Sequence, residues 1–412
     1  METRAQIKAY FETGDFPTQG QFAALIDSAY NSYISVDSLS ELPAPVGNVI
    51  TLPANSTYKI KGSLDLEGNR LVCDGTCVIL GDSSEVSSIT SALSAESLIT
   101  SNYTLIVRHI ELGVSGSGSS ILDLDASLNP NQALDWFGVN FNGGIIGTIK
   151  DYGNSIINLG AVLDCVDGIT FDGTIGTIAF TDWLFANGQS GATLINLPST
   201  LTITRRFRLS YSSVVCGSGV TGIDANSGLT VPPEGFILDT VNFAGAGTYL
   251  GGIDESDDKS RFVECRGVTN TSSDGFYYMQ GNTTDTIISV AGTPVKVLGT
   301  TTNSTATRKF THSNNRLTYD GSLTRRFAVT AIFSVSSGNN NEVSCYVSKN
   351  GVTIPESKQT ITTNAGGRLE NGICKVITQL STTDYIEVFT ANETKIRNIV
   401  YESLTVELQA LS

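Results

Sequence analysis

The sequence predicts a mainly β protein: a right-handed parallel β-helix followed by a C-terminal antiparallel jelly-roll sandwich, with a short N-terminal helical hairpin. Three observations support this fold class. The chain has 41 glycines and only 16 % charged residues among 412, a composition that favours strands joined by many turns. Its middle is a succession of short apolar strands with no helical pattern between them, and its last part consists of longer strands with alternating apolar residues.

Residues 1–35 carry the only helical signals. Thr3 with Gln6, and Thr18 with Gln21, match the capping-box spacing that begins a helix, and Gly14 is a natural helix stop. Apolar residues follow each cap at helical spacing and form one apolar face. Because roughly thirty residues cannot bury enough surface to fold alone, we expect this face to pack on a neighbouring chain or a larger assembly. The alternative is that the hairpin covers the open end of the β-helix.

Residues 36–284 have the pattern of a solenoid. In NVITLPANSTYKIKGSLDLEGNRLVCDGTCVILGD, residues 48–82, short strands are split by Asn, Gly and Asp turns. Near-continuous apolar runs such as AVLDCVDGI, residues 161–169, suit strands that are buried between the coils above and below. The prediction is a right-handed β-helix in which each coil of about twenty residues stacks on the one before. A chain of β-sandwiches is the alternative.

Residues 285–412 show longer strands and hairpin turns. Every second residue from Phe327 to Val335 is apolar, and residues 403–411 alternate in the same way. Asn350-Gly351 is an Asn-Gly dipeptide, which is the strongest two-residue hairpin signal. Strands of this kind, about eight in all, predict a jelly-roll sandwich.

Charge and hydropathy exclude several partners. The net charge is −15, and the densest basic groups are Arg205, Arg206 and Arg208, with Arg325 and Arg326. Because a phosphate backbone requires a basic face, we expect no nucleic acid partner. No stretch is long and apolar enough to cross a bilayer as a helix, so no membrane insertion is expected. The N-terminus lacks the apolar core of a secretory signal, which predicts synthesis in a cytosol.

The cysteines indicate no disulfide framework. There are seven, an odd number, and they are scattered along the chain. Cys73 and Cys77 have the spacing of half a zinc site, but no second Cys/His pair completes it. We therefore predict buried free thiols on strands, with no metal site and no cofactor.

Three stretches resemble phage virion proteins. TRAQIKAYFETGDFPTQGQFAALIDS resembles a short N-terminal module of such proteins, and ITLPANSTYKIKGSLDLEGNRLVCDGTCVILGDSS resembles the first coils of β-helical phage fibres and tailspikes. NRLTYDGSLTRRFAVTAIFSVSSGNNNEVSCYVSKNGVTIPES is similar to the globular head of fibres that share the tumour-necrosis-factor-like, or complement-type, jelly roll. The resemblance implies a homotrimeric tail fibre, head fibre or tailspike, made in the host bacterial cytoplasm and assembled into the virion.

In this interpretation the N-terminal module docks to other virion proteins, and the head adheres to a host surface glycan or receptor. The side chains expected to make the docking contacts are Phe11, Phe16, Phe22, Leu25 and Ile26. A purely architectural head or tail component is one alternative. A tailspike-type depolymerase that cleaves glycans with carboxylates on the β-helix is the other.

The sequence offers no convincing catalytic residue, so we expect no enzyme. Glycoside hydrolysis needs two carboxylates on either side of the scissile bond. The acidic clusters are Asp254, Glu255, Asp257 and Asp258 in one stretch, and Asp164, Asp167 and Asp172 in another. In the first, a solvated loop is favoured over a loose calcium site or a catalytic pair, since the EF-hand spacing is absent. In the second, Asp is expected to cap turns.

Nucleophilic and sugar-stacking sites are equally weak. Only His109 and His312 could activate a serine or cysteine, and no nucleophile-elbow motif occurs. Trp136, Trp183 and the pair Tyr277-Tyr278 are the candidates for stacking on sugar rings. Trp183 has apolar neighbours typical of a core, and Tyr277-Tyr278 is expected to pack the junction between solenoid and head.

Overall fold

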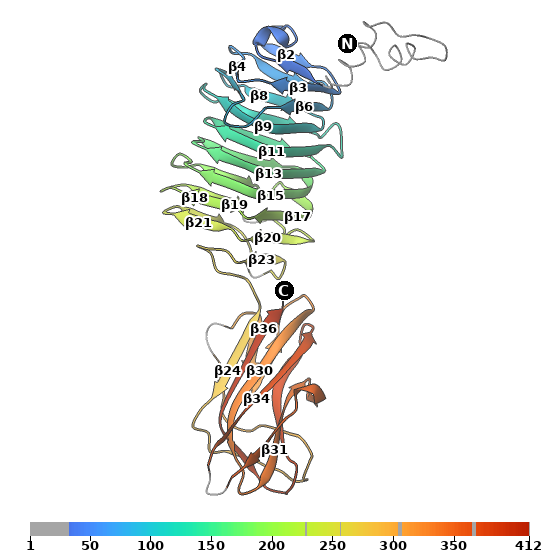
Figure 1. Cartoon of the computed structure of the whole chain (residues 1–412), viewed down its shortest axis with the longest axis vertical. Coiled ribbons are helices and arrows are strands. Elements are labelled where there is room, and N and C mark those ends of the chain that lie inside the picture. The colour runs from blue at the N-terminus through green and yellow to red at the C-terminus, as the bar shows by residue number, and fades with distance from the viewer. Residues whose placement is uncertain (1–32, 227–228, 256, 304–306, 365–367, 412) are drawn as a thin grey trace, which may run out of the picture. The chain divides into compact units, whose positions relative to one another are not determined.

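The structure is a computed structural model that describes residues 33–411 apart from 227–228, 256, 304–306 and 365–367 (Figure 1). The helical hairpin predicted for residues 1–35 falls on residues 1–32, which lie outside the described residues. The described helices are two 3₁₀ turns, η1 (Leu39–Glu41) and η2 (Pro355–Ser357). None of the described helices is long and apolar enough to span a membrane. The chain divides into two compact units, with the boundary between Asn270 and Thr271.

The first unit is a parallel β-solenoid with two sheets, as predicted. Sheet B has nine strands in the order β2 (Val49–Leu52), β5 (Arg70–Cys73), β8 (Ser97–Ser101), β10 (Ser120–Asp125), β12 (Ile145–Lys150), β14 (Asp167–Asp172), β16 (Thr193–Leu197), β19 (Thr221–Ala225) and β22 (Thr248–Gly251). Each coil contributes one strand to sheet B, so the described part contains about nine coils.

Sheet A has fourteen strands. Its continuous path is β1 (Ile34–Val36), β3 (Ser56–Ile60), β6 (Cys77–Leu80), β9 (Leu105–Val114), β11 (Ala133–Asn142), β13 (Asn154–Leu163), β15 (Thr174–Ala186), β17 (Thr202–Ser210), β20 (Gly235–Asp239) and β23 (Ser260–Val263). Beside this path lie β4 (Ser63–Asp65), β7 (Ser88–Ser91), β18 (Ser213–Cys216) and β21 (Asn242–Gly245).

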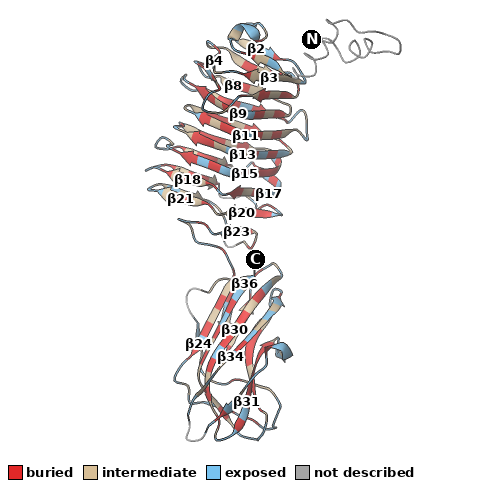
Figure 2. Cartoon of the chain, in the orientation of Figure 1, coloured by how far each residue is buried: buried red, intermediate tan, exposed pale blue. Residues whose placement is uncertain are grey.

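Stacked apolar side chains hold the coils together. Trp136 pairs in register with Val107 in the coil before it and with Ile157 in the coil after it, and Ile157 pairs with Phe180. All four side chains are at most 1 % exposed. Figure 2 shows that buried residues recur along the strands of successive coils. Phe180 packs edge-on against the neighbouring Trp183 ring, with ring centroids 5.5 Å apart. Because every coil buries its apolar residues against the next, the strands need no helices to cover them.

Sheet A bends at one aligned position in each coil. The residues at the bend have left-handed backbone conformations, with φ of 56° at His109, 50° at Leu159, 51° at Tyr211 and 57° at Thr240. Residues on both sides of the bend stay in register, as the pairs Asn158–Thr181 and Gly160–Trp183 show. The bend turns the parallel ladder through a corner, so sheet A forms two sides of each coil and sheet B the third.

The first coil is covered by a short segment at its N-terminal side. Leu42, which follows η1, is 6 % exposed and belongs to the solenoid core, and Leu39 within η1 packs against that core. Through these two residues the segment extends the apolar core at the first coil. Ile34–Val36, which includes the last residues assigned to the helical module, forms β1 and pairs with β3.

The second unit consists of two antiparallel sheets packed face to face. Sheet C contains β27 (Thr302–Asn303), β24 (Asp274–Met279), β36 (Ile399–Leu411), β30 (Arg325–Ser336) and β34 (Glu370–Leu380), in that order, with β25 (Asp285–Thr286) beside β36. Sheet D contains β28 (Phe310–Ser313), β29 (Arg316–Tyr319), β35 (Tyr385–Asn392), β31 (Asn341–Lys349) and β32 (Val352–Thr353), with β26 (Val295–Lys296) beside β35 and β33 (Gln359–Thr363) beside β31.

The core of this sandwich follows the predicted alternation. Phe327, Val329 and Phe333 are at most 1 % exposed, and Leu404 to Leu408 contribute the facing residues of β36. The Asn350-Gly351 turn joins β31 to β32, with Lys349 opposite Val352. The sequence assigned residues up to 284 to the shaft, whereas β24 (Asp274–Met279) pairs with β36 inside the sandwich.

Truncating a stacked aromatic side chain should destabilise the solenoid. Phe180 is fully buried, so Phe180→Ala should lower the free energy of unfolding of the first unit by about 3–5 kcal/mol. Phe137→Ala is the matched control, because Phe137 is 39 % exposed on β11 of the same sheet and its loss should lower the free energy of unfolding by about 1 kcal/mol or less. Guanidinium unfolding of both variants measures this difference. Equal losses in the two variants would contradict the stacked core.

Candidate functional site

The predicted acidic clusters have structural roles. Asp257 lies in the turn between β22 and β23, where its Oδ1 accepts the Lys259 N–H at 2.8 Å. Asp167, the first residue of β14, accepts the N–H groups of Gly168 at 3.0 Å and of Thr193 in the next coil at 2.9 Å. Among the described residues, no group of three or more His, Cys, Asp or Glu side chains could hold a metal ion. Asp167 thus has a structural role, and turn capping by Asp164 and Asp172 stays a prediction.

Neither histidine activates a nucleophile. His109 lies at the bend of sheet A, with its ring edge-on to Phe137 at 5.2 Å between centroids. His312 Nε2 lies 2.8 Å from Thr301 Oγ1, and the Thr301 hydroxyl donates to Asn315 Oδ1 at 2.8 Å. Burial lowers the pKa of His312. Since the hydroxyl already donates to an amide oxygen, this trio is a structural network.

The predicted stacking aromatics are mostly core residues. Trp136 is fully buried and Trp183 is 2 % exposed, so Trp183 is a core residue as predicted. Tyr277 is buried in the sandwich, and Tyr278 is 39 % exposed on the opposite face of β24. The predicted docking side chains, Phe11, Phe16, Phe22, Leu25 and Ile26, lie outside the described residues.

An apolar surface that sequence reasoning missed lies on the outer face of sheet C. Ile332 on β30 is paired with Ile373 on β34, and Ala328 is paired with Ile377. The three isoleucines are 48 % to 54 % exposed. The outer face of an antiparallel sheet is normally polar, so paired exposed isoleucines indicate an interaction surface. We call these four residues the isoleucine face.

Two opposite charges flank the middle of the isoleucine face. Thr330 on β30 separates Lys375 on β34 from Glu407 on β36. Because adjacent strands are about 4.8 Å apart, the Cα atoms of Lys375 and Glu407 lie on the order of 10 Å from each other. Within the described residues neither side chain forms an ion pair, so both are available to an approaching surface.

The outer face of sheet D is different. There Glu387 is 2 % exposed, and its Oε1 accepts Lys296 Nζ at 2.5 Å and Arg316 Nη2 at 3.1 Å. Lys349 Nζ, at the end of β31, pairs with Asp384 Oδ2 at 2.8 Å. Glu387 is thus paired within the chain, whereas Lys375 and Glu407 on sheet C form no ion pair within the described residues.

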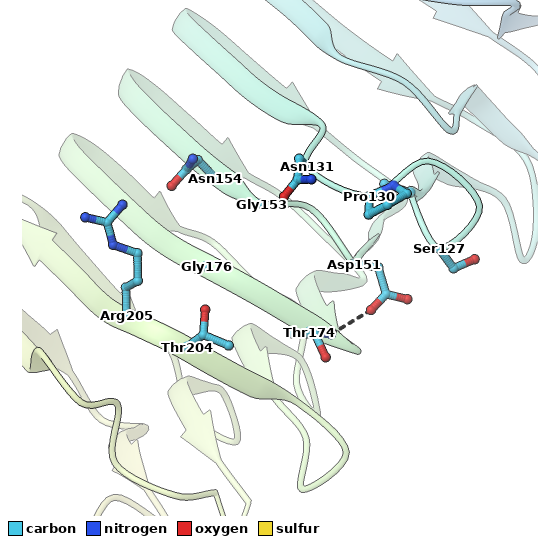
Figure 3. A pocket seen from close by; sticks show the side chains of 11 residues that line it. Ser127, Pro130, Asn131, Asp151, Gly153, Asn154, Thr174, Gly176, Thr204 and Arg205 are labelled. Atoms are coloured by element: carbon cyan, nitrogen blue, oxygen red, sulfur yellow. Dashed lines mark hydrogen bonds between the residues drawn. The ribbon is translucent and has the colours of Figure 1, made fainter.

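A polar groove of about 520 Å³ lies on the solenoid, across the connections from sheet B to sheet A (Figure 3). Its wall comes from residues 126–132, the long connection between β10 and β11. Its floor comes from the short connection of residues 151–153 and from the first residues of β13 and β15, which leave room beside the longer loop. The lining residues are Ala126, Ser127, Pro130, Asn131, Asp151, Gly153, Asn154, Thr174, Gly176, Thr204 and Arg205.

Asp151 is fixed at one end of the groove. Its Oδ1 accepts the Thr174 N–H at 2.7 Å, and its backbone is left-handed with φ of 59°, a conformation that Asp tolerates. Gly173 packs directly against this carboxylate, since an added Cβ would lie 2.3 Å from Asp151 Oδ1. Gly173 also has φ of 66°, so a larger residue there would displace Asp151.

A β-bulge turns two neighbouring residues toward the groove. Ile175 pairs with Ile203 and Thr177 with Arg206, so Thr204 and Arg205 together lie opposite Gly176. Consecutive strand residues normally point to opposite faces, but in a bulge they do not. Thr204 and Arg205 therefore both line the groove, and Arg205 lies toward the end opposite Asp151 (Figure 3).

The groove has the chemistry of a binding site for polar groups. Its lining contains one carboxylate, that of Asp151, whereas glycoside hydrolysis requires two. Sequence reasoning noted Arg205 only as part of a basic run and did not find the other lining residues. No single motif could reveal them, because they come from four coils.

The chain is only distantly similar to known proteins. No protein-family model matches it, and no curated protein matches it. Among solved structures it is similar to Eiger TNF from S. frugiperda, with 12 % identity, a TM-score of 0.22, and coverage of 34 % of this chain and 93 % of that one. The enzymatically active domain of bacteriophage CBA120 tailspike protein 4 has 10 % identity and a TM-score of 0.22, covering 100 % of this chain and 80 % of that one.

A second tailspike shows the same level of similarity. Full-length tailspike protein 2 of an Escherichia coli O157:H7 bacteriophage, named CAB120, has 11 % identity and a TM-score of 0.19. The match covers 89 % of this chain and 65 % of the tailspike chain. Some structural neighbours are thus phage tailspikes, but scores this low do not establish a shared fold.

The thiols should be unreactive in the folded protein. All seven cysteines are buried and free, as predicted. Burial raises the pKa of Cys165 and of Cys216 to about 11, so both remain protonated at pH 8. We expect Ellman's reagent to detect no thiol in the native protein at pH 8 and all seven in guanidinium. Rapid labelling of a native thiol would show that a core strand is accessible.

Proposed function

We propose that this chain is a subunit of a homotrimeric phage fibre or tailspike. The residues before β1 dock to other virion proteins, the first unit, up to Asn270, forms a right-handed β-helical shaft, and the second unit, from Thr271 onward, forms a jelly-roll head that adheres to the host surface. The isoleucine face is the observation that carries this proposal, because an exposed apolar sheet face fits a chain that works as an assembly. The sequence resemblance to phage fibres supports the same interpretation.

The strand order supports a jelly roll. Along the chain, β24, β30, β34 and β36 belong to sheet C, whereas β29, β31, β33 and β35 belong to sheet D. Most successive strands therefore cross from one sheet to the other, as they do in a jelly roll. For the shaft, a right-handed winding is expected because parallel crossovers are right-handed in the great majority of proteins.

Charge supports contact through the isoleucine face. Each chain carries a net charge of −15, so copies repel each other unless they meet at surfaces that are apolar or complementary. In a ring of identical subunits, one edge of the isoleucine face on one subunit contacts the opposite edge of the isoleucine face on the next subunit. Lys375 of one copy can then meet Glu407 of its neighbour. The saturated ion pairs on sheet D give no comparable driving force.

Reversing these charges tests the homotrimer. We expect Lys375→Glu alone and Glu407→Lys alone each to weaken assembly by about tenfold or more, because each creates a like-charge contact between subunits. The double variant Lys375→Glu/Glu407→Lys should restore the trimer. Sedimentation equilibrium of the full chain measures all four proteins. A monomeric wild type would refute the trimer, and unaffected single variants would refute this contact.

Removing the apolar contacts of the N-terminal module tests docking. Phe22→Asp with Leu25→Asp should leave the trimer intact but prevent incorporation into particles, because the predicted apolar face is lost. Immunoblots of purified particles measure incorporation. Ala24→Asp with Asn31→Asp is the control, since helical spacing puts these positions opposite the predicted apolar face.

Particles that assemble without the protein but no longer adsorb would support adhesion. A failure to assemble would instead favour the architectural alternative. Normal incorporation of the Phe22/Leu25 variant would refute the docking role.

A further inference from the structure

We propose that the groove on the solenoid binds an acidic saccharide, with Arg205 contacting its carboxylate. The proposal rests on the proposed function only in placing that saccharide on the host surface. It adds a binding site on the shaft, separate from the adhesion assigned to the head.

The groove offers hydrogen-bonding groups that the protein leaves unused. Within the described residues, the side chains of Asn131, Asn154, Thr174 and Thr204 form no hydrogen bond, and all four are exposed. Asp151 uses Oδ1 for the Thr174 N–H, which leaves Oδ2 for a ligand. Amides, hydroxyls and a carboxylate together match a ligand with many hydroxyl groups.

The floor of the groove allows close approach. Gly153 and Gly176 lie between the polar side chains and present backbone only (Figure 3). Pro130 provides an apolar surface on the wall. The lining contains no large apolar side chain, which disfavours a lipid or an apolar peptide as ligand. The volume lies within the range of roughly 300–1,000 Å³ that small-molecule sites occupy.

Arg205 determines the expected charge of the ligand. Its Nε lies 3.4 Å from Glu234 Oε1, but the two side chains are 59 % and 47 % exposed, so this ion pair is weak. A ligand carboxylate can replace Glu234 and form a bidentate pair with the guanidinium. The bulge holds Arg205 toward the groove, whereas its neighbour Arg206 does not line it. Asp151 at the other end would repel a second acidic group and favour hydroxyls.

The test uses the full-length protein on an array of acidic and neutral bacterial surface polysaccharides. We expect acidic glycans to bind, and Arg205→Gln to weaken the binding by about tenfold or more, since it removes a charge-assisted contact. Arg206→Gln removes the same charge from the adjacent residue and should leave binding unchanged. Glu234→Gln should strengthen binding by freeing Arg205. Asn154→Ala, on a different strand, should weaken it as well.

The outcomes separate this inference from the proposed function. The proposal that the groove binds an acidic saccharide would be overturned by an absence of binding, by a preference for neutral glycans, or by an Arg205→Gln variant that binds as well as the wild type. A trimer that docks to particles but binds no glycan would refute only the proposal that the groove binds a saccharide. A monomer that binds acidic glycans through Arg205 refutes the trimer alone. Thermal melting of each variant shows whether it is folded.

Discussion

In-register stacking of apolar side chains between coils is the interaction on which the first unit depends. Each coil is too short to have a core of its own. Trp136, Ile157 and Phe180 are buried because the coils before and after each of them place apolar side chains at the same position. The stack has two consequences. It requires its first coil to be covered, which Leu39 and Leu42 do, and it fixes the spacing of everything attached to the outer surface.

The surface features of the solenoid arise where the regular ladder is interrupted. The left-handed residues at the bend of sheet A turn the chain through a corner without breaking the register. The bulge at Thr204 and Arg205 places two side chains where a regular strand would place one. The connection formed by residues 126–132 is much longer than the one formed by residue 173, and this difference in length leaves the groove open. Thus a rigid core supports local irregularities that can recognise a ligand.

The sequence predicted the elements whose signal is local. The alternation from Phe327 to Val335, the Asn350-Gly351 turn and the short stacked strands all lie within a few residues. The bend was hard to predict, because only β11 has a glycine there, Gly138, among the coils in which His109, Leu159 and Tyr211 occupy the same position without the usual glycine or asparagine signal. The groove and the isoleucine face could not be found either, because both are assembled from strands far apart in the chain.

The central claim is that three copies of this chain form one fibre attached to a virion. Cryo-electron microscopy of the particle that carries the protein tests it most directly. The account predicts three chains around one axis, with the isoleucine faces between neighbouring heads and residues 1–35 seated on another virion protein. Single chains, or isoleucine faces exposed to solvent, would contradict it.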